Sequence, residues 1–109
     1  MPDRQPQNPD LRTIAELDRT VHSPARLMIL VYLAAVERVD FTFLMNQTGL
    51  TRGNLSSHLS TLEENGYVEI QKEFVDKKPL TLIRLSAAGE QALEDYRQSM
   101  RKVIDGLLG

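Results

Sequence analysis

The chain has 109 residues, enough for one small domain, and its 41% apolar and 26% charged content is typical of globular proteins. The 13 Lys and Arg against 15 Asp and Glu give a net charge of -2, which excludes a uniformly basic nucleic-acid coat but not a local basic patch. The absence of cysteine excludes disulfides, Cys-ligated metals and thiol catalysis. The longest apolar run, Leu27 to Val36, is too short to cross a bilayer, and the polar start differs from a secretory signal. We therefore expect a cytoplasmic protein with no membrane contact.

The first part of the chain predicts a tail and two helices. Residues 1–9 hold three prolines among polar neighbours, so we expect a flexible tail there. Asp10 can cap a short helix whose apolar side chains share one face. Ser23 and Pro24 form a stronger start signal, a hydroxyl cap followed by proline at the first helical position. Apolar residues occupy every side of the second helix, 24–35, so we expect it to be buried nearly all round.

The middle of the chain predicts a helix-turn-helix. A short extended segment, 39–41, precedes a brief helix that Thr42 can cap and that Gly49 ends. Thr51 caps the next helix, 52–65, after a tight turn. The buried face of this helix is a stripe of leucines at helical spacing: Leu55, Leu59 and Leu62.

After Gly66 the apolar period changes from helical to two, which indicates a β-hairpin. Val68 and Ile70 alternate with polar residues on the outgoing strand, and the returning strand alternates over 81–85. The connection 75–79 is polar and contains a proline, so we expect it to be the hairpin loop.

Ser86 can cap a long final helix that runs toward Gly106. Its apolar residues repeat with steps of three and four, which is the spacing of a short coiled-coil seam. This seam either joins two copies of the chain or packs back on its own domain, and we favour the dimer. The predicted dimerisation residues are Leu93, Tyr96, Met100, Val103 and Leu107.

Together these elements predict an α+β fold, a winged helix-turn-helix that is mostly helical, with a two-stranded wing and a long C-terminal helix, all within residues 10–109. The chain resembles the MarR/ArsR-like transcriptional regulators, in particular the small stand-alone winged-helix DNA-binding domain proteins. The resemblance extends over roughly residues 20–96, and its most specific part is the block from Gly49 to Leu59 with Leu62-Glu63 and Gly66-Tyr67-Val68 after it. Weaker matches are the segments 26–30, 77–79 and 85–89.

The resemblance implies a homodimer on double-stranded DNA, with recognition helix 52–65 in the major groove and wing 74–80 on the backbone. The wing tip of MarR-type proteins carries Asp-x-Arg, whereas this chain has lysine at Lys78, in Asp76-Lys77-Lys78. Lysine keeps the positive charge but loses the bidentate fork of arginine. No effector-binding residue transfers from the resemblance, so whether a small molecule regulates the protein stays unknown.

The residues themselves indicate which side chains reach DNA. If the leucine stripe faces the core, short hydroxyl and amide side chains on the opposite face can bond to base edges. Between Thr51 and Leu85, five basic residues balance five acidic ones, so any positive patch depends on their arrangement. Arg84 is a further candidate for a phosphate contact. The candidate DNA-binding residues are Thr51, Arg52, Gly53, Asn54, Ser56, Ser57, Ser60, Lys72, Lys77 and Lys78.

Other functions have less support in the sequence. His58 lies beside the leucine stripe, where a packing or capping role is expected, and His22 precedes the Ser23 cap. Two distant histidines make a weak metal site, and we expect no metal and no cofactor. No phosphate-binding loop or hydrolase motif occurs, so an enzyme is not expected. The main alternative is a winged-helix protein–protein adaptor that does not bind DNA.

Overall fold

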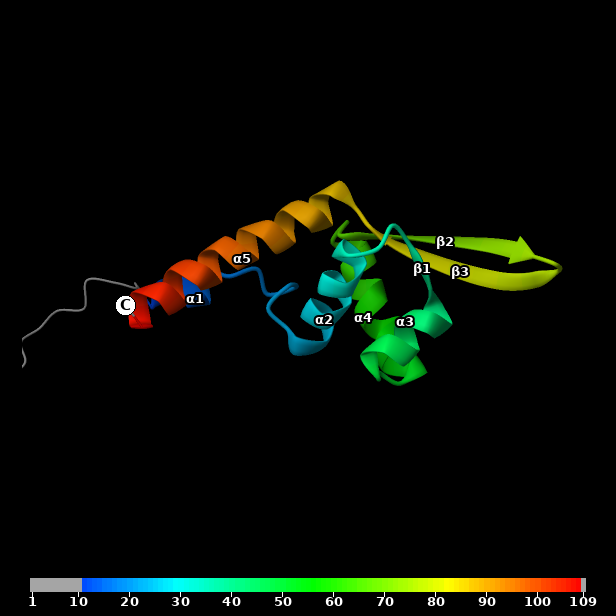
Figure 1. Cartoon of the computed structure of the whole chain (residues 1–109), viewed down its shortest axis with the longest axis horizontal. Coiled ribbons are helices and arrows are strands. Elements are labelled where there is room, and N and C mark those ends of the chain that lie inside the picture. The colour runs from blue at the N-terminus through cyan, green and yellow to red at the C-terminus, as the bar shows by residue number, and fades with distance from the viewer. Residues whose placement is uncertain (1–10, 109) are drawn as a thin grey trace, which may run out of the picture.

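The computed structural model describes residues 11–108. Figure 1 shows a cluster of helices in the middle of the molecule, a long helix extending to one side and a β-hairpin projecting to the other. The expected tail over residues 1–9 and the expected cap at Asp10 lie outside the described residues. The predicted winged helix-turn-helix is confirmed, with the elements α1 (Arg12–Ala15), α2 (Pro24–Ala34), β1 (Val39–Asp40), α3 (Phe41–Thr48), α4 (Arg52–Glu64), β2 (Val68–Val75), β3 (Lys78–Leu85) and α5 (Ala87–Leu108).

Helix α2 begins as predicted but is less buried than predicted. The Ser23 side chain accepts a hydrogen bond from the Arg26 N–H, and Pro24 opens the helix. Its buried side chains, Ile29, Leu30 and Leu33, form the centre of the core. Met28 and Val31 are 39% and 55% exposed, so the expectation of burial on all sides is wrong. The reason is that α3, α4, α5 and β3 contact α2, and no other described element makes a comparable contact with the remaining side.

The helix-turn-helix consists of α3 and α4. Helix α3 begins at Phe41 because Asp40, and not Thr42 as predicted, accepts the hydrogen bond from the Phe43 N–H at 3.0 Å. Gly49 ends it with a φ of 72°, a left-handed conformation that costs glycine little. Thr51 then caps α4, since its hydroxyl oxygen accepts the Asn54 N–H at 3.2 Å.

The sheet has three strands in the order β1-β3-β2, one more than predicted. The two-residue β1 pairs with β3, so the expected extended segment joins the sheet and anchors the start of α3. Strands β2 and β3 are antiparallel, and Ile70 lies opposite Ile83. Because Ile83 is fully buried, this end of the hairpin belongs to the core, and the rest projects from it as the wing.

The wing turns more tightly than expected. Residues Val75, Lys78 and Pro79, predicted as loop, are paired within the strands. Only Asp76 and Lys77 form the turn, with φ values of 52° and 67°. Two successive positive φ angles are those of a type I′ turn, whose twist matches that of paired strands and therefore allows the pairing to continue to the tip.

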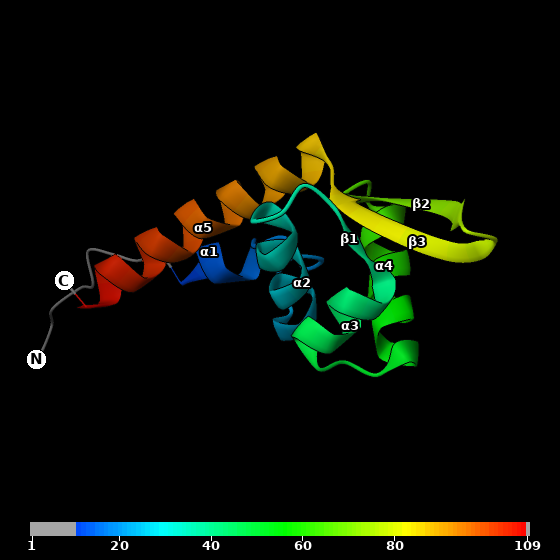
Figure 2. The same ribbon diagram turned by 45° about the vertical axis from the view of Figure 1, so that its right-hand side comes forward.

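Helix α5 is capped by Ser86, whose hydroxyl oxygen accepts the Gly89 N–H at 3.0 Å, as predicted. Figures 1 and 2 both show α1 alongside α5. Within one chain, Leu93 and Tyr96 pack against the core and Val103 is buried, with 2% of its surface exposed. Met100 is half-buried, and the side chain of Leu107 lies outside the described part. Most of the predicted seam therefore has partners in its own domain, and its role between two copies stays a prediction.

Candidate nucleic-acid interface

The outer face of α4 presents short polar side chains to solvent. Leu55, Leu59 and Leu62 are at most 2% exposed, and their burial turns the other side of the helix outward. The orientation predicted for this helix is confirmed, and DNA contact by its residues stays a prediction. The exposed residues on this side include Gly53, Asn54, Ser56, Ser57 and Ser60.

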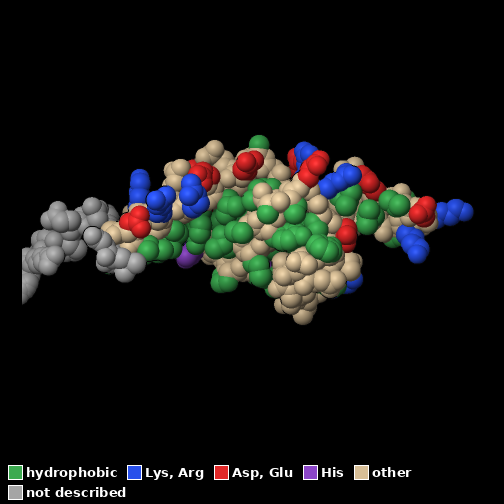
Figure 3. Space-filling model, in the orientation of Figure 1, with side chains coloured by type: hydrophobic (Ala, Val, Ile, Leu, Met, Phe, Trp, Pro, Cys, Tyr) green, Lys and Arg blue, Asp and Glu red, His purple; other side chains and the backbone are tan. Residues whose placement is uncertain are grey.

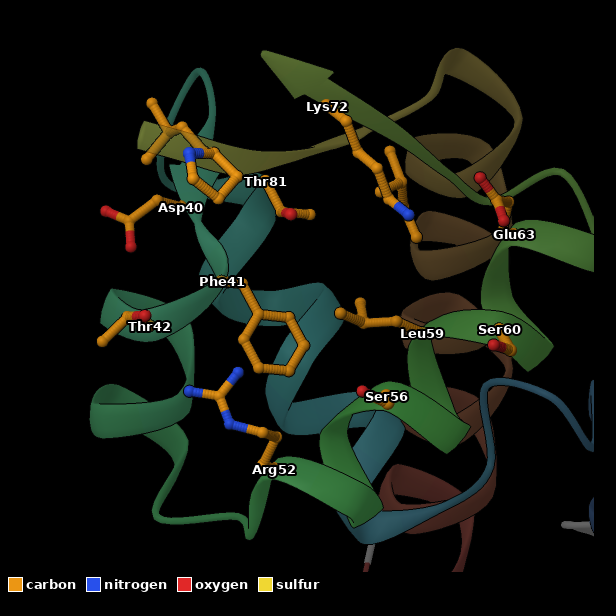
Figure 4. Close-up of a pocket in the computed structure, with 13 residues that line it drawn as sticks. Asp40, Phe41, Thr42, Arg52, Ser56, Leu59, Ser60, Glu63, Lys72 and Thr81 are labelled. Atoms are coloured by element: carbon orange, nitrogen blue, oxygen red, sulfur yellow. The ribbon is translucent and has the colours of Figure 1, made fainter. Parts of the chain in front are cut away.

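A hollow of about 750 Å³ lies between α4 and the wing. Figure 4 shows α4 forming one wall, with Ser56 and Ser60 along it, and the hairpin forming the opposite wall. Apolar side chains, including Leu59 and Ile70, contribute to its lining. The sequence indicated the serine wall but gave no sign of the hollow, because the wing joins it only through the tertiary fold.

Arg52 stands at the mouth of this hollow, in the first turn of α4. Its guanidinium carbon Cζ lies 5.2 Å from the centre of the Phe41 ring, which is within the range of a cation–π contact. Figure 4 shows the guanidinium beside that ring. The contact orients a cation next to the N-terminus of α4, where the helix dipole also favours anions. Phe41 is a site residue that the sequence analysis missed, because its role depends on α3 packing beside α4.

Lys72 extends from β2 into the hollow on the opposite wall, as Figure 4 shows. Its cross-strand neighbour is Thr81, which lines the same hollow. Glu63 of α4 and Asp40 also line it, so Lys72 and Arg52 are accompanied by two acidic groups at this surface. Asp40 is already engaged as the cap of α3.

The strand register distributes the charged side chains of the hairpin over its two faces. Side chains alternate between the faces of a strand, so Lys72 shares a face with the core residue Ile70. Glu69 and Glu73 lie on the other face, where Glu69 forms an ion pair with Arg84. The strand register places Arg84 on the face that points away from α4, and the phosphate contact expected of it stays a prediction.

Lys77 and Lys78 lie at the tip of the wing, both exposed, where the sequence placed them. Lys77 is in the turn itself, while Lys78 begins β3 opposite Val75. Figure 3 shows Lys and Arg side chains at the far end of the hairpin. The structure thus brings Lys72 into the hollow with Arg52 and keeps the two tip lysines apart from it.

Arg26 of α2 connects α4 to the loop that precedes α2. Its Nε donates to the carbonyl oxygen of Thr20 at 2.7 Å, and its Nη1 lies 3.2 Å from Nδ1 of His58 on α4. A guanidinium has no acceptor, so His58 Nδ1 accepts this hydrogen bond. The half-buried His58 is therefore a packing residue, as predicted, and it joins α4 to Arg26 of α2.

Asp18, in the loop before α2, accepts a hydrogen bond from Tyr67, which follows α4 in the chain. One carboxylate oxygen accepts the Thr20 N–H at 2.8 Å, and the other accepts the Tyr67 hydroxyl. The hydrogen bond to Asp18, with burial as a second cause, raises the pKa of Tyr67 to about 12. Tyr67 donates its proton only while it is neutral, so the bond persists at physiological pH.

The ionisable groups among the described residues do not form a metal centre. Within residues 11–108, no three His, Asp or Glu side chains converge in a way that would hold a metal ion. His22, the other histidine, has its Nδ1 2.8 Å from the Tyr96 hydroxyl. No helix in the described part of the chain has the length and apolar character to cross a membrane.

Comparison with known proteins identifies the family. A family model described as a winged helix DNA-binding domain matches residues 25–104. The chain belongs to this family. An uncharacterised protein of Methanocaldococcus jannaschii is 36% identical over 75 residues, which cover 69% of this chain and 82% of that protein. The relationship therefore extends over most of both chains.

Solved structures agree with this assignment. A transcriptional regulator homologue from Pyrococcus horikoshii OT3 superposes with a TM-score of 0.83 and 31% identity, covering 88% of this chain and 97% of that one. A MarR mutant from E. coli complexed with operator DNA has a TM-score of 0.63 and 20% identity, covering 81% of this chain and 68% of that one. The latter likeness shows the fold alone. The predicted resemblance to MarR-like winged-helix regulators is confirmed.

Proposed function

We propose that this winged-helix protein is a homodimeric, sequence-specific DNA-binding transcriptional regulator. In this proposal α4 enters the major groove and the wing, residues 74–80, follows the backbone, which its tip residues Lys77 and Lys78 contact. The observation that carries it is the hollow between α4 and the wing, with Arg52 and Lys72 on opposite walls. A phosphate strand in this hollow would meet a cation on each side, while the serine face of α4 meets base edges.

Each proposed contact has a role that follows from its side chain. Ser56, Ser57 and Ser60 offer hydroxyls to bases, and Gly53 lets the backbone approach closely. Thr51 contributes through its cap, which sets the start of α4. The full set is Thr51, Arg52, Gly53, Asn54, Ser56, Ser57, Ser60, Lys72, Lys77 and Lys78.

The proposed dimer uses the α1–α5 end of the molecule, opposite the wing in Figure 1. Leu11 at the N-cap of α1, Ile14 on α1 and Ile104 on α5 are 64%, 37% and 44% exposed. Such apolar side chains favour a symmetric contact between copies. Part of the predicted seam packs within each chain and so holds α5 in place for this contact. The seam residues are Leu93, Tyr96, Met100, Val103 and Leu107. A dimer would present two copies of α4 to a palindromic site.

Fluorescence anisotropy tests the proposal with DNA from upstream of the protein's own gene and with scrambled DNA, over a salt series. We expect tighter binding to the upstream DNA that persists as salt is added, because base contacts are less salt-sensitive than phosphate contacts. The double variant Ser56→Glu/Ser57→Glu should lose this binding and keep the dimer. The matched control Ala87→Glu/Gln98→Glu adds the same charge at exposed positions of α5 and should bind like the wild type.

Two results would contradict this function. Equal binding to both DNAs that salt abolishes would exclude sequence-specific recognition, and no binding at all would favour the protein–protein adaptor. If the Ser56→Glu/Ser57→Glu protein fails to dimerise in a sedimentation experiment, the DNA-binding face on α4 and the dimerisation face on α1 and α5 are wrongly assigned.

A further inference from the structure

Phe74 is an apolar side chain in an unexpected place. It lies near the end of β2 and is 77% exposed, more than any other large hydrophobic residue whose exposure the structure describes. Figure 3 shows apolar side chains along the hairpin among charged ones. The wing therefore presents an aromatic ring to solvent beside its lysines, and neither the leucine stripe nor the basic residues account for it.

The strand register places this ring on the side of the wing that faces α4. Phe74 and Lys72 are two positions apart on β2, so their side chains leave the same face of the strand. Phe74 pairs with Pro79 as Lys72 pairs with Thr81, and both partners line the hollow between α4 and the wing. Phe74 and Pro79 thus continue the wing wall of the hollow toward the tip.

The surroundings of Phe74 indicate which partner it contacts. Lys72 precedes it on the same face, and the turn beyond it holds Lys77 together with Asp76, so a lysine lies on either side of the ring along the hairpin. A buried phenylalanine contributes roughly 150–250 Å² of contact, whereas a stable protein interface needs about 800 Å² per partner. One ring on a narrow hairpin suits a groove of nucleic acid better than a protein surface.

We propose that Phe74, supported by Pro79, is an apolar DNA contact of the wing that packs against deoxyribose in the minor groove. Apolar side chains on minor-groove binding elements are an established way to contact DNA without reading hydrogen-bonding groups. The lysines neutralise phosphates while the ring contributes affinity that salt does not screen. This inference rests on the function proposed above.

The test compares Phe74→Ala with Val75→Ala, in the same anisotropy assay. Val75 is the adjacent apolar residue, 49% exposed, and alternation places it on the opposite face of the wing. We expect Phe74→Ala to weaken DNA binding about tenfold at every salt concentration, with an unchanged slope of log affinity against log salt. Val75→Ala should stay within about twofold of the wild type, and Lys72→Ala should flatten the slope by about one unit.

Folding and assembly controls accompany the binding curves. Because Phe74 is exposed, its replacement should leave the melting temperature and the sedimentation coefficient unchanged. If the wild type binds DNA and Phe74→Ala binds it equally well, the inference is overturned and the proposed function stays intact. A loss shared equally by Val75→Ala, a changed salt slope or a changed oligomeric state would also overturn it. If the wild type itself binds no DNA, the proposed function fails first.

Discussion

Gly89 allows α5 to approach the turn that follows α4, and its replacement by alanine tests this packing. Gly89 is buried in the first turn of α5. A Cβ atom there would lie 2.1 Å from the backbone oxygen of Tyr67 and 2.8 Å from Cδ1 of Leu85. The Leu85 side chain can move aside, but the Tyr67 carbonyl is fixed because it accepts the Ser86 N–H at 3.0 Å. The Gly89→Ala protein must therefore move α5 away from this turn.

The expected cost follows from three contributions. Overpacking of a buried site costs about 1–3 kcal/mol. Loss of the Ser86–Tyr67 hydrogen bond adds about 1 kcal/mol. Alanine returns about 1 kcal/mol through its greater helix propensity. We expect a net loss of about 2 kcal/mol in the free energy of unfolding, which lowers the melting temperature of a domain this size by roughly 8–16 °C.

Thermal melting followed by circular dichroism measures this change, and Gly53→Ala is the matched control. Gly53 is also helical, but a Cβ there meets nothing within 4 Å. Its replacement should be neutral or stabilise the protein by up to about 1 kcal/mol. If Gly89→Ala melts at or above the wild-type temperature, the close approach of α5 to Tyr67 is not a real constraint on the fold.

Two further predictions concern Tyr67 and the wing turn. The pKa of Tyr67 is raised to about 12 by its hydrogen bond to Asp18 and by burial, so its contribution to stability is complete below the unfolded value near 10 and is lost as pH rises to 12. Urea unfolding should show this decline between pH 10 and 12 in the wild type and a flatter profile in Tyr67→Phe; identical profiles would contradict the assignment. Lys77→Gly should stabilise the protein by about 0.5–1 kcal/mol, because a φ of 67° strains a non-glycine residue. The same substitution should weaken DNA binding and reduce the salt slope by about one unit, and an unchanged slope would show that Lys77 touches no phosphate.

Local features were predictable because short stretches of sequence determine them. The Ser23, Thr51 and Ser86 caps bond to backbone groups three residues away, and Gly49 ends α3 by taking a conformation that other residues avoid. Where two candidate caps lie close together, the sequence was less informative. Asp40 rather than Thr42 caps α3, because the pairing of β1 with β3 brings the start of the helix forward.

The core face of α4 was also determined by the sequence, since a leucine stripe with helical period has only one side to bury. The sequence did not determine which elements cover a given helix face. Every side of α2 is apolar in the sequence, yet Met28 and Val31 are exposed, because burial depends on which elements arrive from elsewhere in the chain.

The candidate site shows the same division. The sequence by itself determined the polar outer face of α4 and the positions of the wing lysines, through periodicity and turn chemistry. Only the tertiary structure decided that Lys72 joins Arg52 across a hollow, that Phe41 holds Arg52, and that Glu69 and Arg84 pair on the opposite side of the wing. The physical reason is that strand register and the packing of the hairpin beside α4 depend on contacts between residues far apart in the chain, which local periodicity does not specify.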